Sequence, residues 1–286
     1  MARAQEIAAQ TGSLKELGEI VAAIRVVAAA QMQESQRYLE GIRNYVTIIR
    51  NTVAEATALL PEKATDAIPH VALRSGLVVF GAEHGFCGAF NEPLIREATG
   101  ASRTQPKPYL IFAGTRCAQR SSEQGLRPDM ILPTATHSGV VSAAARRVAA
   151  EVYRLITSEI ISTISVLYMR SVSGSANNLK KLQLLPIEMQ GTIGQRTQFA
   201  PLINMKPRRL RDELAAEYVF AMLEAAAMES FASENTARFH TMEAAHENIR
   251  TKSLELDRLA RRMRQEAVTS EILDLIGGAE AVKQGR

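Results

Sequence analysis

Proline is confined to the middle of this chain. All ten prolines lie between Pro61 and Pro207, so residues 1–60 and 208–286 contain none, and no glycine occurs from Gln195 to Ile276. Inside a helix, proline costs about 3 kcal/mol and glycine about 1 kcal/mol. Stretches that avoid these residues therefore favour long, uninterrupted helices. The sequence predicts one such helix at each end of the chain and a differently built segment between them.

Apolar and small residues recur three and four positions apart in both terminal segments, which is the spacing of a coiled-coil seam. In the first segment these residues are Leu14, Leu17, Val21, Ile24, Ala28, Gln31, Ser35, Tyr38, Ile42, Tyr45, Ile49 and Val53. In the last they are Leu214, Tyr218, Ala221, Ala225, Met228, Ala232, Asn235, Phe239, Met242, His246, Ile249, Ser253, Leu256, Ala260, Met263 and Ala267. At about 1.5 Å per residue, each helix would be on the order of 80–100 Å long. We expect the two helices to pair antiparallel.

The middle segment has a different pattern, in which short apolar runs alternate with helical stretches. Strands are expected at 76–80, 109–113, 130–132, 164–168 and 182–185, and helices at 90–99, 115–124 and 139–159. This alternation favours a small, mostly parallel, Rossmann-like α/β sheet. The predicted fold class is thus α plus α/β. Three domains are expected, namely a coiled-coil helix over 1–60, an α/β domain over 70–205, and a helix over 208–286 that pairs with 1–60.

Composition argues against several functions. The net charge is only +4, with 34 basic and 30 acidic residues interspersed, whereas a nucleic-acid binder gathers its basic residues on one face or arm. No apolar run approaches the roughly 20 residues of a membrane-spanning helix, and the N-terminus lacks the layout of a signal peptide. The chain is therefore expected to be soluble. Cys87 and Cys117 lie thirty residues apart without a CxxC spacing, so we expect two small buried side chains in a reducing compartment.

Nothing in the sequence forms a convincing catalytic or ligand-binding motif. The turn Gly81–Gly88 has the wrong glycine spacing for a dinucleotide loop. His84 and Cys87 have no second pair of ligands with which to hold zinc. We therefore expect no catalytic residues, no metal and no cofactor.

Three groups of residues, in order along the chain, are similar to one known family. They are Arg25 with Val27-Ala28-Ala-Ala in the first helix; Gly85-Phe-Cys87-Gly88-Ala-Phe-Asn91 in the central turn; and Ser233-Glu234, Ala237-Arg238, Arg264-Gln265-x-x-x-Thr269 and Ile276-Gly-Gly-Ala near the end. Together they resemble the gamma subunit of F-type ATP synthases, over essentially the whole chain.

The resemblance implies a non-catalytic rotor shaft that couples ion translocation to ATP synthesis or hydrolysis. Its partners would be the alpha and beta subunits of the catalytic hexamer, the epsilon subunit and the membrane c-ring. Its location would be the cytoplasmic face of a bacterial inner membrane, peripherally bound through the complex. The residues expected to meet the catalytic subunits and their collar are Arg264, Gln265, Thr269, Glu271, Ile272, Leu275 and Ile276.

The chain also departs from the family pattern. Ala8, Ala9, Ala22 and Gln31 stand where basic residues are common in the family.

The main alternative to the rotor shaft is a coiled-coil scaffold or adaptor unrelated to any ATPase. A small-molecule enzyme built on the α/β domain, and a nucleic-acid binder using the arginines between 258 and 264, are weaker alternatives.

Overall fold

The structure is a computed structural model. It describes residues 2–60, 74–104, 106–170, 178–187 and 202–284, with side chains from Glu6 onward except at 271 and 274–284. The chain divides into two compact units. One comprises Met1–Val27 and His240–Arg286, and the other comprises Ala28–Phe239.

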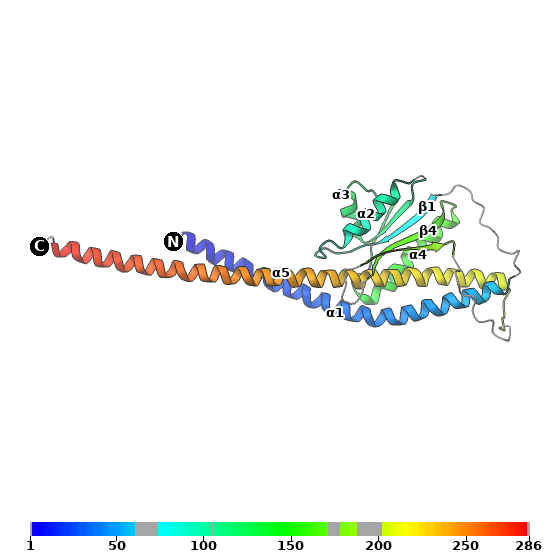
Figure 1. Ribbon diagram of the computed structural model, residues 1–286, viewed down its shortest axis with the longest axis horizontal. Coiled ribbons are helices and arrows are strands. Elements are labelled where there is room, and N and C mark those ends of the chain that lie inside the picture. Colours follow the sequence, from blue (N-terminus) through cyan, green and yellow to red (C-terminus); the bar gives the residue numbers. More distant parts are fainter. Residues whose placement is uncertain (1, 61–73, 105, 171–177, 188–201, 285–286) are drawn as a thin grey trace. The chain divides into compact units, whose positions relative to one another are not determined.

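The first and the last element of the chain are long helices, as the distribution of proline predicts. Helix α1 runs over Ala2–Ala58 and helix α5 over Pro207–Gln284. Helix α1 therefore ends just before the first proline, Pro61. Helix α5 begins at the last one, because the first helical position tolerates proline, whose missing N–H has no acceptor there. The two helices pack together, which confirms the predicted pairing of the chain ends (Figure 1).

A five-stranded sheet forms the centre of the second unit. Its strands are β1 (Arg74–Phe80), β2 (Tyr109–Ala113), β3 (Met130–Leu132), β4 (Ile161–Arg170) and β5 (Asn178–Leu185), in the order β3-β2-β1-β4-β5. The pairs β1–β2, β1–β4 and β2–β3 are parallel, and only β4–β5 is antiparallel. All five expected strands are present and the sheet is mostly parallel, so the predicted fold class is confirmed. Strands β4 and β5 extend beyond their predicted ranges.

Helices cover both faces of this sheet. Helices α2 (Asn91–Ser102) and α3 (Thr115–Glu123) pack on one face, in a core that contains Leu77 and Val79 of β1. Helix α4 (Val141–Thr157), preceded by the short 3-10 helix η2 (Ser138–Val140), packs on the other face together with α5, against Val78 and Phe80. Alternate residues of β1 thus enter opposite cores, as the pleat of a strand requires.

The seam of α1 follows the predicted seven-residue repeat in part. The predicted members Ile24 and Gln31 are half-buried, whereas three others are exposed. In the second unit its buried members include Ala28, Ser35, Leu39, Ile49 and Val53. The predicted members Leu17, Tyr38 and Tyr45 instead point outward, with exposed fractions of 52%, 46% and 38%. At these three places the next residue, Gly18, Leu39 or Val46, is buried or half-buried instead.

Residue size explains the error in the first unit. The inward position next to Leu17 belongs to Gly18, and a Cβ atom added there would lie 3.3 Å from Cγ2 of Ile249 on α5. A glycine at the seam permits a close approach of the two backbones, but a hydrophobicity pattern passes over it. For α5 the predicted positions from Met242 to Met263 are buried or half-buried, whereas the predicted seam residue Ala267 is exposed.

Candidate functional site: a buried polar joint on the C-terminal helix

One stretch of α5 is enclosed on every side. Every residue from Ala226 to Asn235 is buried, although five of the last seven are polar. A helix buried all round is normally apolar, and buried polar groups are stable only when they are hydrogen-bonded. The partners of these side chains therefore show what this part of the helix is built to hold.

Two serines of this stretch fasten α5 to two neighbouring strands. The hydroxyl of Ser230 donates to the carbonyl of Phe80, the last residue of β1, at 2.7 Å. The hydroxyl of Ser233 donates to the carbonyl of Met169 near the end of β4, at 3.1 Å. Both acceptors lie at the carboxyl ends of parallel strands. Helix α5 thus occupies the edge at which open α/β sheets commonly bind ligands.

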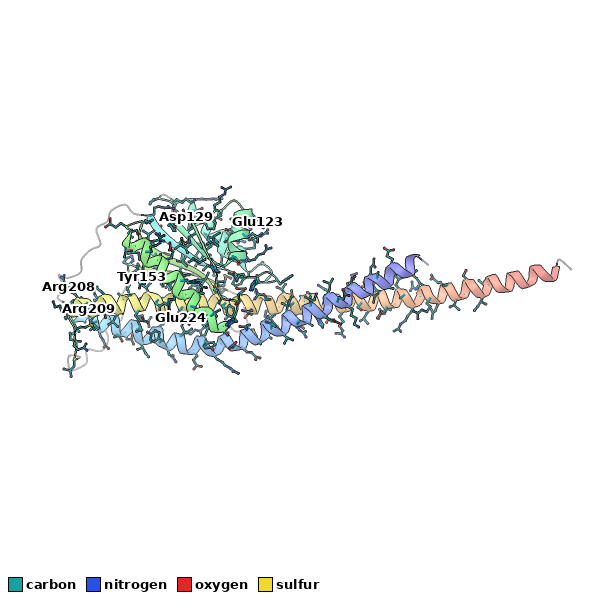
Figure 2. The ribbon with its side chains drawn as sticks, turned by 180° about the vertical axis from the view of Figure 1, so that it is seen from behind. Glu123, Asp129, Tyr153, Arg208, Arg209 and Glu224 are labelled. Carbon is teal, nitrogen blue, oxygen red and sulfur yellow. The ribbon has the colours of Figure 1, made fainter. Side chains whose placement is uncertain are left out.

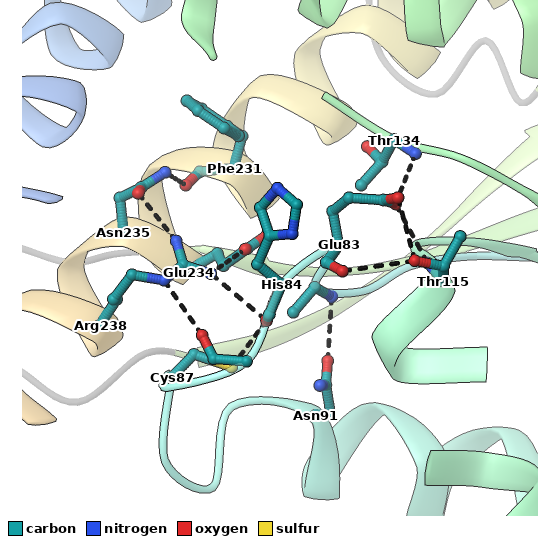
Figure 3. A network of polar contacts seen from close by, with 12 residues as sticks. Glu83, His84, Cys87, Asn91, Thr115, Thr134, Phe231, Glu234, Asn235 and Arg238 are labelled. Carbon is teal, nitrogen blue, oxygen red and sulfur yellow. Dashed lines mark hydrogen bonds and ion pairs between the residues drawn. The ribbon is translucent and has the colours of Figure 1, made fainter. Parts of the chain in front are cut away.

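A buried ion pair continues the contact one turn further along α5. The carboxylate of Glu234 is 3% exposed, pairs with Arg238, and accepts hydrogen bonds from the backbone N–H groups of Glu83 and His84. Arg238 in turn donates to the carbonyl of Gly85 at 3.2 Å and of His84 at 3.3 Å. Figure 3 shows this network between α5 and the turn that follows β1.

The charge state of Glu234 reflects its enclosure. Burial raises the pKa of Glu234 above its ordinary value of 4.5, whereas Arg238 and the two backbone N–H groups lower it. Asn235 completes the arrangement. Its side-chain oxygen accepts from Arg238 at 2.9 Å, and its side-chain nitrogen donates to the carbonyl of Phe231 at 3.0 Å. The arginine is therefore held by a carboxylate, an amide and two carbonyl groups.

The turn after β1 is itself fixed from the other side. The carboxylate of Glu83 accepts from the N–H of Thr115 at 3.1 Å and from the N–H of Thr134 at 2.9 Å. The side-chain oxygen of Asn91 accepts from the N–H of Ala82 at 3.0 Å. Gly81 allows the close packing, since a Cβ atom there would lie 2.4 Å from Sγ of Cys117. Residues 81–91 are thus held in place by these contacts, and α5 packs against them.

A second ion pair joins α1 to the same stretch of α5. The carboxylate of Glu229 accepts from Arg43 of α1 at 3.0 and 2.6 Å, and Arg170 at the end of β4 lies 3.5 Å from it. These two cations are nearly half-exposed, whereas Glu229 is buried. Helix α1, helix α5 and strand β4 therefore meet at one carboxylate.

Helix α4 contacts α5, and the short helix η2 before it contacts α1. Gln31 of α1 accepts from the backbone N–H of Ser138 at 3.1 Å. The hydroxyl of Tyr153 donates to the carbonyl of Ala216 at 2.7 Å, and Ser142 bonds Glu224; Figure 2 shows where Tyr153 and Glu224 lie.

We call the contacts of Ser230, Ser233, Glu234 and Arg238 with the sheet edge and its turn the polar joint.

The structure brings the central motif residues to this joint. Gly85, Cys87 and Gly88 lie in its turn, and Asn91 is the first residue of α2 just after it. Gly88 has the positive φ of 58° that suits glycine. Burial raises the pKa of Cys87 to about 11. It also raises the pKa of Cys117. Both thiols are buried, as predicted, and neither has the lowered pKa of a reactive cysteine.

The motif residues of α1 have separate surroundings. Arg25 forms an ion pair with Glu243 of α5 at 2.9 Å, within the first unit. Val27 is 60% exposed, whereas Ala28 is fully buried. The resemblance thus singles out one residue in an ion pair, one on the surface and one in the seam.

The residues predicted to meet catalytic subunits lie elsewhere, on the exposed end of α5. Arg264, Gln265 and Thr269 are exposed, and the hydroxyl of Thr269 bonds the carbonyl of Gln265 in its own helix at 2.8 Å. Ile272 is 51% exposed. The side chains of Glu271, Leu275 and Ile276 lie outside the described ones.

Glu234 and Arg238 belong to a motif that carries the family resemblance, but neither they nor Ser230 were expected to form a site. A signal was available, because the polar residues between Glu229 and Asn235 spread over about 240° around a helix, which is too wide for a single solvated side. In the part of the chain that the structure describes, no three His, Cys, Asp or Glu side chains gather closely enough to hold a metal ion. Within the same ranges, no helix has the length and hydrophobicity needed to cross a bilayer.

The site is thus a buried polar contact that fixes a long paired helix on an α/β domain, and this defines a structural rather than a ligand-binding arrangement. A family profile described as ATP synthase matches residues 3–282. The ATP synthase gamma chains of Symbiobacterium thermophilum and Ralstonia nicotianae are 27% and 26% identical to the chain. The first comparison covers 95% of both chains, and the second covers 99% of this chain and all of its relative.

Solved structures agree with the fold. The rotor of Euglena gracilis mitochondrial ATP synthase matches with a TM-score of 0.62 at 15% identity, covering 93% of this chain and 99% of that one. A second structure of the Euglena enzyme, of its OSCP/F1/c-ring part, matches with a TM-score of 0.66 at 18% identity, covering 99% and 96%. The chain belongs to the ATP synthase family as a gamma chain, the non-catalytic central shaft of the F-type enzyme.

Proposed function

We propose that this gamma chain transmits torque between an ion-driven c-ring in the membrane and a catalytic hexamer of alpha and beta subunits. It would thereby couple ion translocation to ATP synthesis or hydrolysis. The observation that carries the proposal is the polar joint, because torque applied to the α/β domain has to enter α5 through a contact that does not slip.

The joint has the properties that such a contact needs. Its hydrogen bonds reach the ends of two strands, through Phe80 and Met169, and a turn that is fixed by Glu83. Rotating α5 against the sheet would break these buried bonds together, and each unsatisfied group would cost roughly 1–3 kcal/mol. From there, α5 continues as one helix to Gln284. Packed interiors transmit strain because they deform little.

The other end of α5 supplies the surface that would act on the hexamer. Arg264, Gln265 and Thr269 are exposed polar residues on a helix, and Ile272 adds exposed apolar area. We propose that these residues, together with Glu271, Leu275 and Ile276, contact the loops and collar of the catalytic subunits. An asymmetric helix can shift the conformations of chemically identical partners only through contacts that differ between them.

The remaining assignments follow from the family. We propose that the epsilon subunit and the c-ring bind the α/β domain, and that the chain is held peripherally at the cytoplasmic face of a bacterial inner membrane. The division into 1–60, 70–205 and 208–286 stays a prediction. The coiled-coil scaffold unrelated to an ATPase accounts less well for this chain, because the family profile covers both helices and the domain between them.

The proposal is tested by purifying the tagged full-length chain from its native cells and assaying the material for ATP hydrolysis. Co-purification of an ATPase that pumps ions into inverted membrane vesicles is expected. A chain that purifies without any ATPase, while remaining folded by circular dichroism, would support the scaffold alternative instead.

A further inference from the structure

Two polar contacts of α1 reach different supports in the second unit. Arg43 donates through Nε and Nη2 to one oxygen of Glu229 on α5, at 3.0 and 2.6 Å. Twelve residues earlier, the side-chain oxygen of Gln31 accepts from the backbone N–H of Ser138, at the start of η2, at 3.1 Å. The two side chains start about 18 Å apart along the helix and leave it in directions about 120° apart. Supports placed in this way oppose both rolling of α1 about its axis and sliding of α1 along α5.

The acceptor of Arg43 is itself bound to the sheet. Nε of Arg170, the last residue of β4, lies 3.5 Å from the same Oε1 atom of Glu229. Glu229 is buried, whereas the two arginines are nearly half-exposed. Leaving a buried carboxylate without its cation is strongly unfavourable, so this arrangement keeps the three groups together. The end of β4, helix α5 and helix α1 are therefore linked through a single oxygen atom.

This link differs from the polar joint in what it holds. The joint fixes α5 by bonds to Phe80, to Met169 and to the turn after β1, whereas the Glu229 contact includes a residue of α1. The seam of α1 beside these contacts contains the small residues Ala28 and Ser35. Apolar packing is non-directional, whereas a hydrogen-bonded ion pair has a defined geometry, so the ion pair fixes the position of α1 more firmly than the seam does.

We propose that Arg43 and Gln31 are positioning residues that make α1 a second load-bearing helix of the shaft. Arg43 acts through Glu229, which passes force from the sheet to α1, and Gln31 keeps α1 from turning under that load. This inference rests on the proposed shaft function and adds a second path for torque to it. Without these contacts the sheet still turns α5 through the polar joint, but α1 lags behind, and part of the ATP is hydrolysed without ion transport.

The test is made in the assembled complex, by measuring ATP hydrolysis and ion pumping in the same inverted membrane vesicles. Arg43→Met should lower the number of ions pumped per ATP while hydrolysis continues, and Arg43→Lys should retain more of the coupling because it keeps the cation. Glu229→Met removes the acceptor, so Arg43→Met combined with Glu229→Met should lose no more coupling than Glu229→Met alone. A merely structural role would instead reduce the yield of the complex and leave the ions pumped per ATP unchanged.

The matched control is Arg37→Met, which removes an exposed cation from α1 six residues earlier and should leave the ions pumped per ATP unchanged. An equal loss in this control would overturn the proposal, as would normal coupling in Arg43→Met or additive losses in the double variant. If Arg43→Met does not assemble, Gln31→Ala provides the same readout without removing a charge, and normal coupling there would overturn the proposal too.

The two proposals fail separately. If the native chain purifies with an ion-pumping ATPase and Arg43→Met couples normally, the shaft function stands and the role of α1 falls. If the native chain purifies without any ATPase, the shaft function itself falls.

Discussion

Two regions of the same helix differ in how their polar residues are used. Between Ala226 and Asn235, α5 is buried on every side, and its polar side chains are bonded to strands, to a turn and to α1. Between Arg264 and Ser270 every residue is exposed. The first region has its partners within the chain. The second has a solvent-facing surface, as expected of a helix whose partners are other subunits.

The difference fits the two tasks that we propose for this helix. A buried polar joint gives α5 a fixed orientation on the sheet, because every bond has a specific acceptor. Exposed polar residues leave the other region able to meet several partners in turn. Substitutions in the two regions should therefore affect different measurements, with stability changed in the first and activity of the complex in the second.

The largest effect is expected for Arg238→Met. The substitution leaves the carboxylate of Glu234 buried without its cation, and breaking a buried pair in this way costs about 3–5 kcal/mol. Urea unfolding followed by circular dichroism measures the loss. The matched control is Arg250→Met, whose pair with Glu247 is exposed and 3.4 Å long, and it should change little. Equal effects of the two substitutions would remove the distinction between the regions.

The same variant should show a characteristic dependence on pH. The pKa of Glu234 is already raised by burial, and removing Arg238 takes away an interaction that lowers it. A raised pKa in the folded state means that stability is fully present below about 4.5 and is lost as pH rises through the folded pKa. The deficit of Arg238→Met relative to the native chain should thus grow as pH rises past the folded pKa that Glu234 has in the native chain, which lies above 4.5. A deficit that shrinks with rising pH would contradict this account of Glu234.

A smaller loss is expected for Ser230→Ala. The carbonyl of Phe80 loses its hydroxyl partner in a buried place, at a cost of about 1–2 kcal/mol. Ser35→Ala is the control, since Ser35 is also buried but bonds only the carbonyl of Gln31 in its own helix. The unfolding midpoint should fall more for Ser230→Ala. The reverse order would show that the joint adds no stability beyond ordinary helix packing.

Two glycines of α1 test how closely the helices approach in the first unit. Gly12 has open space at its Cβ position, so Gly12→Ala should stabilise the helix by about 1 kcal/mol. At Gly18 the new methyl group would press on Ile249, so Gly18→Ala should gain clearly less. Thermal unfolding of the two variants decides the matter. An equal gain would mean that the seam is loose at Gly18.

No stability change is expected for Arg264→Glu, because the side chain is exposed and forms none of the joint. In the assembled complex, the same change should lower ATP turnover more than Arg103→Glu, a control at the C-cap of α2. Equal turnover of the two complexes would count against Arg264 as a contact with the catalytic subunits.

Much of this fold could be predicted because it depends on local signals. Proline positions set the ends of α1 and α5, and apolar runs located all five strands. Three seam positions of α1 were predicted one residue too early, at Leu17, Tyr38 and Tyr45. At the first, the inward neighbour is Gly18, which a hydrophobicity pattern does not register. The polar joint was missed for another reason. Ser230 bonds Phe80 across 150 residues of chain, and no local pattern identifies such a partner.

The central claim is that the α/β domain and α5 turn together. It is tested most directly by attaching a bead to the sheet of the assembled complex through Lys180→Cys. This residue is exposed on β5, whereas Cys87 and Cys117 are buried. When ATP is added to immobilised complexes, the account predicts steady rotation of the bead in one direction. Continued ATP hydrolysis with a bead that only fluctuates at random would contradict it.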